Sequence, residues 1–358
     1  MNAANWSSEH LAEAVVYTLA DSLLLGCFFA LIIGCLVVAM KRSSAALRYN
    51  FLILILTAFV LSLIVCFFYN WSPGSTALLA DQAAGWQHGV KLINEHAAVI
   101  FRVWFILIGL QLVRVAFELY TLNRLSKTGV VHPGLMWVQK VAVFSTILGI
   151  RREVRLAGSS RVSTPMVTGF FKPVILVPIA LLGLMSVAEV EAMLLHELAH
   201  VRRADFLVNI LIRLVRILLF FNPLVWWLCK LLDAEREHCC DDMAVHITGD
   251  KLNYTRTLVR FSEHVTPSSA LAMTLTHGML GRVERLVTGR SRPLARLELI
   301  CLSVVLVLSL LLVNPYNHSS LVSLARPPAQ NLNSGKPPDA AAKAAKQKAE
   351  QSALKKGR

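Results

Sequence analysis

The stretch FLILILTAFVLSLIVCFFY, residues 51–69, has no charged side chain and is long enough to cross a bilayer core as one helix. Residues 17–40, 98–120 and 297–313 are also predominantly apolar. The first of these lacks the basic start and the small-residue cleavage site of a removable signal peptide, so we expect it to remain. With 55% hydrophobic and 16% charged residues and a mean hydropathy of +0.57, the chain is too apolar for an ordinary soluble protein. The sequence predicts a mainly α-helical membrane protein with a four-span transmembrane bundle.

The basic residues of the loops predict an orientation. Three of them lie between the first two spans: Lys41, Arg42 and Arg48. The N-terminal segment carries Glu9 and Glu13 instead, and the loop 70–96 is nearly neutral. Because Lys and Arg are enriched on the cytoplasmic side of membrane proteins, we expect the N-terminus outside and residues 121–296 in the cytoplasm.

Enrichment of Lys and Arg at the cytoplasmic ends of spans also explains the net charge of +14. In a membrane protein, excess Lys and Arg marks the cytoplasmic ends of spans more often than a nucleic-acid site, so we expect no direct binding of nucleic acid. Of the seven cysteines, four lie in apolar runs and three within residues 229–240. The sequence therefore shows no extracellular disulfide framework.

We divide the chain into four parts: three transmembrane helices with short loops (1–120), a domain at the cytoplasmic membrane boundary (121–296), the fourth span (297–313) and a basic, low-complexity tail (314–358). Within the second part, residues 135–150 are predicted to be helical. Residues 151–182 alternate short apolar runs with Gly, Ser and Pro, which indicates two or three short strands. The tail has the composition of a disordered linker.

A helix with the chemistry of a metal site is predicted to follow. Ser186 and Glu189 form a capping box, and apolar residues at helical spacing continue through LLHELAHVRRAD (194–205). His196 and His200 are four residues apart and share one face, with Glu197 at its border. A zinc hydrolase needs such a set: two imidazole ligands, an open position for water and a carboxylate that takes its proton. Chance occurrence of this short pattern is the alternative until a third ligand is found.

A third ligand is expected in DAEREHCCDDMAV, residues 233–245. This acidic helical run offers Glu235, Glu237, His238, Asp241 and Asp242. Glu237 and Asp241 share a face, so that one can bind the metal while the other accepts a hydrogen bond from a ligand histidine. We favour Glu237 as the ligand. His238 is the competing choice, and a merely solvated helix face is the alternative for the whole run.

Between the two motifs lies the apolar segment 206–232. A single crossing would put His200 and Glu237 on opposite sides of a bilayer core that is about 30 Å thick, where they could not share an ion. Pro223 divides the segment into pieces too short for two crossings. We therefore expect an amphipathic helix at the membrane surface or against the spans, with one polar face: Asn209, Arg213 and Arg216.

Three stretches together resemble the BlaR/MecR-type membrane zinc metallopeptidases, the signal transducers of inducible β-lactam resistance: GFFKPVILVP (169–178), LLHELAHVRRAD (194–205) and EREHCCDD (235–242). The resemblance covers about the first 310 residues. It implies His196, His200 and Glu237 as zinc ligands, Glu197 as the catalytic glutamate, and Asp241, after Cys240, as the acid of the family's Cys-Asp pair. It also implies a gluzincin-like domain that faces the cytoplasm of a bacterium, at its inner membrane.

The chain also departs from that family. Members that sense β-lactams end in a large extracellular penicillin-binding domain, whereas only residues 314–358 follow the last predicted span. The sequences SALK (Ser352–Lys355) and KTG (Lys127–Gly129) resemble penicillin-binding motifs. The first lies in a tail too short for a domain, and the second is predicted on the other side of the membrane. We expect no direct antibiotic sensing by this chain.

The leading functional prediction is a membrane-embedded zinc endopeptidase. The resemblance suggests that it cleaves a cytoplasmic protein, such as a transcriptional repressor, or its own loop, in envelope or antibiotic-response signalling. The alternatives are an HtpX-like quality-control protease and a non-catalytic scaffold with a structural zinc. Candidates for oxyanion stabilisation remain open: His246, Tyr254 and His277. Expected partners are the lipid bilayer and the protein substrate, and a homo-oligomer is left open.

Overall fold

The computed structural model describes residues 3–72, 87–264 and 270–289. Three helices are long and apolar enough to cross a membrane: α1 (Ala3–Ala39), α2 (Ala45–Trp71) and α4 (Gln87–Leu125). They cover the first three predicted spans, at 17–40, 51–69 and 98–120, apart from residue 40. The predicted fourth span, 297–313, and the tail, 314–358, lie outside the described residues.

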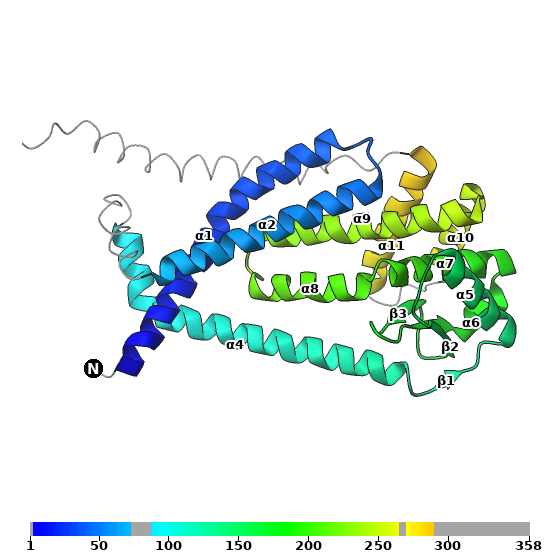
Figure 1. The fold of residues 1–358 in the computed structure, drawn as a ribbon, viewed down its shortest axis with the longest axis horizontal. Coiled ribbons are helices and arrows are strands. Elements are labelled where there is room, and N and C mark those ends of the chain that lie inside the picture. The colour runs from blue at the N-terminus through cyan, green and yellow to red at the C-terminus, as the bar shows by residue number, and fades with distance from the viewer. Residues whose placement is uncertain (1–2, 73–86, 265–269, 290–358) are drawn as a thin grey trace, which may run out of the picture. The chain divides into compact units, whose positions relative to one another are not determined.

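The first two helices pack against each other along an apolar seam (Figure 1). The chain reverses between them at Ser44, whose side chain accepts a hydrogen bond from the Leu47 amide and so caps α2. Phe59 and Leu52 of α2 and Ile33 of α1 are fully buried in this seam. The same cluster continues into α9 (Pro223–Thr248), so the candidate spans and the later helices share one core.

A four-stranded sheet lies in the second part of the chain. Its order is β1-β2-β4-β3, with β2 (Arg155–Ser159) and β4 (Val174–Pro178) parallel and β3 (Met166–Thr168) antiparallel to β4. The three strands within 151–182 confirm the prediction for that segment. Strand β1 (Val130–Val131) was not predicted, because two residues carry no periodic signal.

The turn between β3 and β4 requires a glycine. Gly169 has φ 85°, and a Cβ at this position would lie 2.9 Å from the carbonyl oxygen of Lys172. The tight turn lets Phe170 and the strand residues before it line one side of the cavity described below. Arg152 links this turn to the end of α7 (Val187–Arg202). Its Nη1 donates to the Phe170 carbonyl at 2.7 Å, and its Nη2 donates to the Val201 carbonyl at 3.0 Å.

Helices α5 (Leu135–Ile147), α6 (Ile179–Leu184) and α7 (Val187–Arg202) surround the sheet. The predicted capping box at the start of α7 is confirmed, since Ser186 Oγ accepts from the Glu189 amide and the Glu189 carboxylate accepts from the Ser186 amide. Leu194 and Leu198 of α7 are fully buried in a cluster with Ile175 of β4. This packing fixes the α7 face that bears the histidines.

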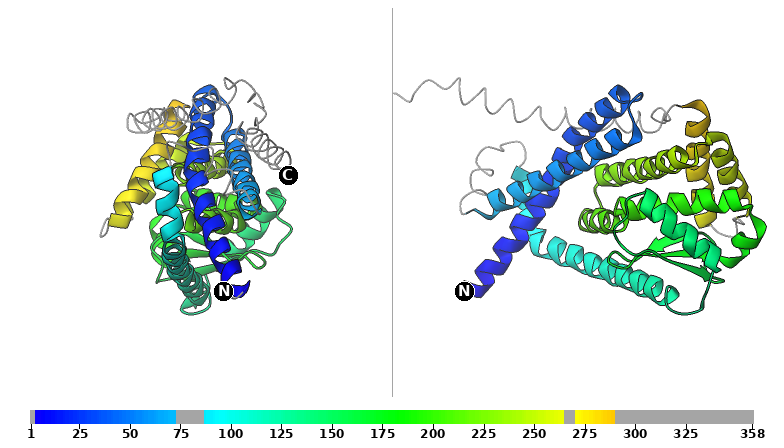
Figure 2. Two further views of the ribbon diagram at one scale, coloured as in Figure 1. Left: turned by 90° about the vertical axis from the view of Figure 1, so that its left-hand side faces the viewer. Right: turned by 45° about the vertical axis from the view of Figure 1, so that its right-hand side comes forward.

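The apolar segment 206–232 folds as a hairpin and not as one continuous helix. Helix α8 (Asp205–Leu218) and α9 run side by side (Figures 1 and 2). In the turn that joins them, the side chain of Asn222 caps α9, ahead of Pro223. The side-chain Nδ2 of Asn222 also donates to the Ser22 carbonyl at 2.9 Å. Ser22 lies near the middle of the apolar part of α1. Of the two expected placements, the hairpin thus lies against the candidate spans.

The polar face predicted for α8 is used in packing against α4 and α9. Arg213 forms an ion pair with Glu118 of α4, and Arg216 stacks on Trp226 of α9 at 4.6 Å. Two more helices follow, α10 (Lys251–His264) and α11 (Ala270–Thr288), and α9 ends at Gly249 with φ 67°. Helices α10 and α11 pack on each other and both contact α9.

Candidate metal centre

The two histidines of α7 face α9 across a short gap, where they meet Glu237. His196 Nε2 lies 3.4 Å from Glu237 Oε2, and His200 Nε2 lies 3.8 Å from Glu237 Oε1. One atom from each of these three side chains lies within 4.8 Å of the others. The structure therefore brings together the three side chains predicted as ligands.

This donor set fits a metal ion. Ligand atoms about 2 Å from a shared tetrahedral ion are roughly 3.3 Å from each other, close to the observed separations. Two imidazole nitrogens and a carboxylate oxygen leave a fourth position for water or substrate. Three residues of α7 and α9 can hold a divalent ion with an open coordination site: His196, His200 and Glu237.

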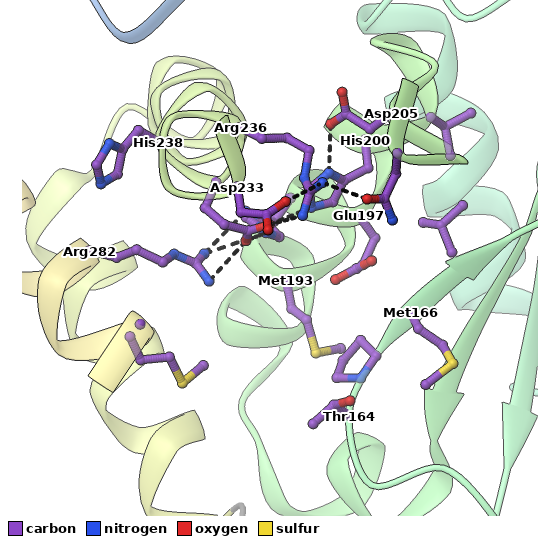
Figure 3. A pocket seen from close by; sticks show the side chains of 18 of the residues that line it. Thr164, Met166, Met193, Glu197, His200, Asp205, Asp233, Arg236, His238 and Arg282 are labelled. Atoms are coloured by element: carbon purple, nitrogen blue, oxygen red, sulfur yellow. Dashed lines mark hydrogen bonds and ion pairs between the residues drawn. The ribbon is translucent and has the colours of Figure 1, made fainter. Parts of the chain in front are cut away.

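Glu197, next to the first histidine, is oriented toward a cavity (Figure 3). The cavity has a volume of about 960 Å³ and also exposes His196, His200 and Glu237. The Glu197 side chain receives no hydrogen bond from any residue that the structure describes. An unengaged carboxylate beside the ligand cluster can accept and return a proton.

The Nδ1 side of His196 is supported by Asp241, four residues after Glu237. Asp241 Oδ1 lies 3.3 Å from His196 Nδ1 and accepts a 2.7 Å hydrogen bond from the Tyr254 hydroxyl. Arg282 of α11 donates to both Asp241 oxygens, from Nε at 3.0 Å and from Nη2 at 2.5 Å. The Asp241 carboxylate is thus fixed where it can hold the imidazole with Nε2 toward Glu237.

These contacts change the titration of the cluster. Burial and Arg282 lower the pKa of His196, but hydrogen bonds to Asp241 and Glu237 outweigh both and raise it to about 9. Burial raises the pKa of Asp241, yet Arg282 and His196 together hold it well below its usual range. The pKa of Glu237 is likewise held low, against burial, by His196, Arg282 and His200. Both carboxylates are ionised at neutral pH.

A second carboxylate supports His200 in the same way. Asp205 Oδ2 lies 2.8 Å from His200 Nδ1, and the Cys240 thiol lies 3.3 Å from the same nitrogen. Arg203 Nε holds the other oxygen of Asp205 at 3.3 Å. His200 Nε2 is therefore left to face Glu237.

Sequence reasoning missed Asp205 and Arg282. Asp205 stands at the end of the quoted motif, five residues after His200, and this spacing was the available signal. Arg282 lies on another helix, and no local pattern connects it with the histidines. Tyr254 was one of three open candidates for oxyanion stabilisation; its hydroxyl donates to Asp241 and lies 3.1 Å from His196 Nδ1.

The remaining acidic and histidine candidates lie elsewhere. His238 points away from the cluster, with its Nδ1 3.4 Å from Glu235 (Figure 3). Asp242 pairs with Arg285 at 2.6 Å, and His246 lines a separate small cavity. The side chain of His277 lies outside the described residues. None of these four described residues, Glu235, His238, Asp242 and His246, is among the three candidate ligands.

The part of the chain that forms the candidate metal centre matches a known protein family. Residues 74–286 match the family model described as BlaR1 peptidase M56. The chain belongs to this family of metallopeptidases. The M56 match spans α4 to α11 and includes every residue of the cluster described above.

The chain is similar to two named regulatory or resistance proteins. The chain is 29% identical over 215 residues to the regulatory protein BlaR1 of Bacillus licheniformis, a match of 56% of this chain and 34% of that protein. It is 27% identical over 114 residues to the methicillin resistance mecR1 protein of Staphylococcus aureus, with 31% of this chain and 20% of that protein matched. The chain thus aligns with about a third or less of either relative. The M56 family match thus occurs in a chain whose described part has three helices long and apolar enough to cross a membrane.

Proposed function

We propose that this M56 protein is a zinc endopeptidase that cleaves a cytoplasmic protein, or its own chain, in envelope or antibiotic-response signalling. The observation that carries the proposal is the unengaged Glu197 carboxylate beside two imidazoles and Glu237. Nitrogen and carboxylate donors in this number suit zinc. A scaffold with a purely structural zinc would have no use for an open cavity at the ligands.

Zinc bound to His196, His200 and Glu237 would supply Lewis-acid polarisation of a peptide carbonyl and of an attacking water. Glu197 accepts the proton from the water as it attacks. The same carboxyl group then delivers the proton to the departing nitrogen, so that the C–N bond breaks with a neutral amine as leaving group and not an amide anion. Asp241 and Asp205 keep the two imidazoles oriented during these transfers.

The cavity walls suggest how a substrate binds. Strand β3 is an edge of the described sheet and lines the cavity with Thr164 and Pro165, which precede it. An extended peptide can add to such an edge by backbone hydrogen bonds. Four methionines face the same space: Met166, Met185, Met193 and Met279. Their flexible side chains favour a large apolar residue next to the cleaved bond.

The location of the site supports a cytoplasmic substrate. The buried ion pair between Arg48 and Glu235 joins the start of α2 to α9, two residues before Glu237. The metal centre therefore lies at the same end of the candidate spans as the basic loop with Lys41 and Arg42, the end expected in the cytoplasm. With three spans before a cytoplasmic metal centre, the N-terminus would lie outside the inner membrane, and residues 297–313 as a fourth span would place the tail outside as well.

The resemblance to the BlaR/MecR-type proteins suggests the substrate class. A regulatory protein and a methicillin resistance protein are consistent with a transcriptional repressor as the cleaved partner. In that case nucleic acid is bound by the substrate and not by this chain. An HtpX-like reading is less favoured, because such proteases place two full spans where this chain has the α8–α9 hairpin.

The test is Glu197→Gln in cells that carry the native partner. Zinc content and folding should stay near wild type, whereas cleavage of the repressor, or of the chain itself, should fall about 10²- to 10⁴-fold. His196→Ala should lose both zinc and cleavage. If Glu197→Gln signals like wild type while His196→Ala fails, the zinc is structural and the scaffold reading replaces the protease.

A further inference from the structure

The first turn of α2 carries two adjacent buried residues, Arg48 and Tyr49, with exposed fractions of 6% and 7%. Both lie at the end of a candidate span, yet both are directed toward the helices of the metal centre. Arg48 contacts α9, and Tyr49 contacts the end of α7. This turn of α2 therefore contacts both ligand-bearing helices.

Arg48 provides the contact with α9. Its Nε donates to Glu235 Oε1 at 2.9 Å, and its Nη2 lies 2.8 Å from Glu235 Oε2. The side chains are almost fully buried, and Arg48 Nη1 also donates to the Ser43 carbonyl at 2.6 Å. A two-point, buried pair of this kind restricts rotation as well as distance.

The pair controls the direction of Glu237. Residues two apart on a helix point about 200° away from each other, so Glu235 faces α2 while Glu237 faces α7. A rotation of α9 about its axis would separate Glu235 from Arg48 and turn Glu237 away from His196 and His200. The Arg48–Glu235 pair therefore fixes the rotation at which Glu237 meets the imidazoles.

Tyr49 provides the contact with α7. The Arg203 guanidinium lies over the Tyr49 ring, 4.5 Å from its centroid. Arg203 Nε is 3.3 Å from Asp205 Oδ1, and Asp205 Oδ2 is 2.8 Å from His200 Nδ1. Three consecutive contacts thus connect the Tyr49 ring with the ligand imidazole.

We propose that Arg48 and Tyr49 of α2 are positioning residues for the metal centre and make its geometry depend on the placement of this membrane helix. The proposal rests on the proposed function in one respect, that His196, His200 and Glu237 bind zinc. A shift of α2 would then act on Glu237 and His200 together. Two ligands on different helices would respond to a single movement.

The experiment uses the full-length protein in detergent, with zinc affinity measured by chelator competition. Arg48→Met and Tyr49→Leu should each lower zinc affinity by about 10- to 100-fold, as losses of outer partners of ligands do. Loading with Co²⁺ should show a changed visible absorption spectrum, because the ligand geometry is altered. Tyr49→Phe keeps the ring and should bind zinc like wild type.

Glu118→Gln is the matched control. It weakens another charged contact between a candidate span and the hairpin, the Glu118–Arg213 pair, which touches no ligand partner. Thermal stability should fall as for the α2 variants, while zinc affinity and the Co²⁺ spectrum stay unchanged. This contrast separates positioning from general stability.

Wild-type zinc affinity and an unchanged Co²⁺ spectrum in Arg48→Met and Tyr49→Leu would overturn the proposal. If Arg48→Met does not fold, Glu235→Gln and Tyr49→Leu decide by the same two measurements. Failure of the proposed function has a different signature, in which His200→Ala binds zinc as tightly as wild type.

Discussion

Arg282 of α11 clamps Asp241 of α9, with its Nε 3.0 Å from Oδ2 and its Nη2 2.5 Å from Oδ1. The guanidinium also lies 3.4 Å from Glu237 Oε2 and 3.4 Å from both ring nitrogens of His196. The Arg282 guanidinium thus contacts two candidate ligands, His196 and Glu237. It also contacts the Asp241 carboxylate, which supports His196. The centre is completed by a third helix that bears no ligand itself.

The first prediction concerns the ligands. Glu237→Ala should weaken zinc retention sharply, because two imidazoles alone hold the ion poorly. Asp241→Ala should cost about 10- to 100-fold in zinc affinity, since it removes the acceptor at His196 Nδ1. His238→Ala is the control and should retain zinc, as its ring turns toward Glu235. Metal content after dialysis measures all three, and zinc loss only in His238→Ala would reassign the third ligand.

The second prediction concerns pH, which should affect metal binding through His196, whose pKa is about 9 without metal. Zinc binds the neutral imidazole, so below pH 9 its binding displaces a proton from His196. Displacement of one proton changes the apparent affinity by about tenfold per pH unit. Affinity should therefore rise from pH 7 to about 9 and then level off. A titration that is flat over this range would contradict the assignment.

The stability of the metal-free protein should follow the opposite trend. The folded pKa of His196 lies above its ordinary value of 6.5, so the protonated imidazole stabilises the folded protein. This contribution is fully present below pH 6.5 and is lost as the pH rises through about 9. Asp241→Asn should flatten the dependence by removing a charge that raises the pKa. Thermal unfolding of metal-free protein at pH 6, 8 and 10 measures both effects.

The third prediction concerns the start of α7. Ser186→Ala removes the side chain that accepts from the Glu189 amide and should destabilise the protein by about 1 kcal/mol. Ser126→Ala removes a hydroxyl that donates to the Asn123 carbonyl at an exposed site, and should change stability far less. Denaturant unfolding in mild detergent compares the two. Equal effects would show that the capping box contributes little.

The fourth prediction concerns topology. Reporter fusions after Lys127 and after Gly249 should report the same compartment, the cytoplasm, because α7 and α9 meet at one site. A fusion after Asn314 should report the opposite side if residues 297–313 cross the membrane. An outside signal after Gly249 would be incompatible with a cytoplasmic metal centre.

Local patterns predicted a large part of this molecule. Helix α7, its capping box and the shared face of His196 and His200 follow from spacing alone, and Pro223 marks the break between α8 and α9. The contacts of Arg48, Asp205 and Arg282 were not predicted. From the sequence, Arg48 was interpreted only as a basic loop residue that indicates orientation. Its partner Glu235 lies 187 positions away in the chain. Such pairs depend on tertiary packing, which a single sequence does not reveal.

The hydrogen bonds from Asn222 to Ser22 join positions 200 apart in the chain. Closing so long a loop is slow, and this contact can form only after α1 and the whole intervening stretch have been synthesised. The hairpin can therefore pack against α1 only after the helices between them have been made. During biosynthesis the ligands of α7 and α9 meet late, so a nascent chain should remain proteolytically silent until its assembly is nearly complete.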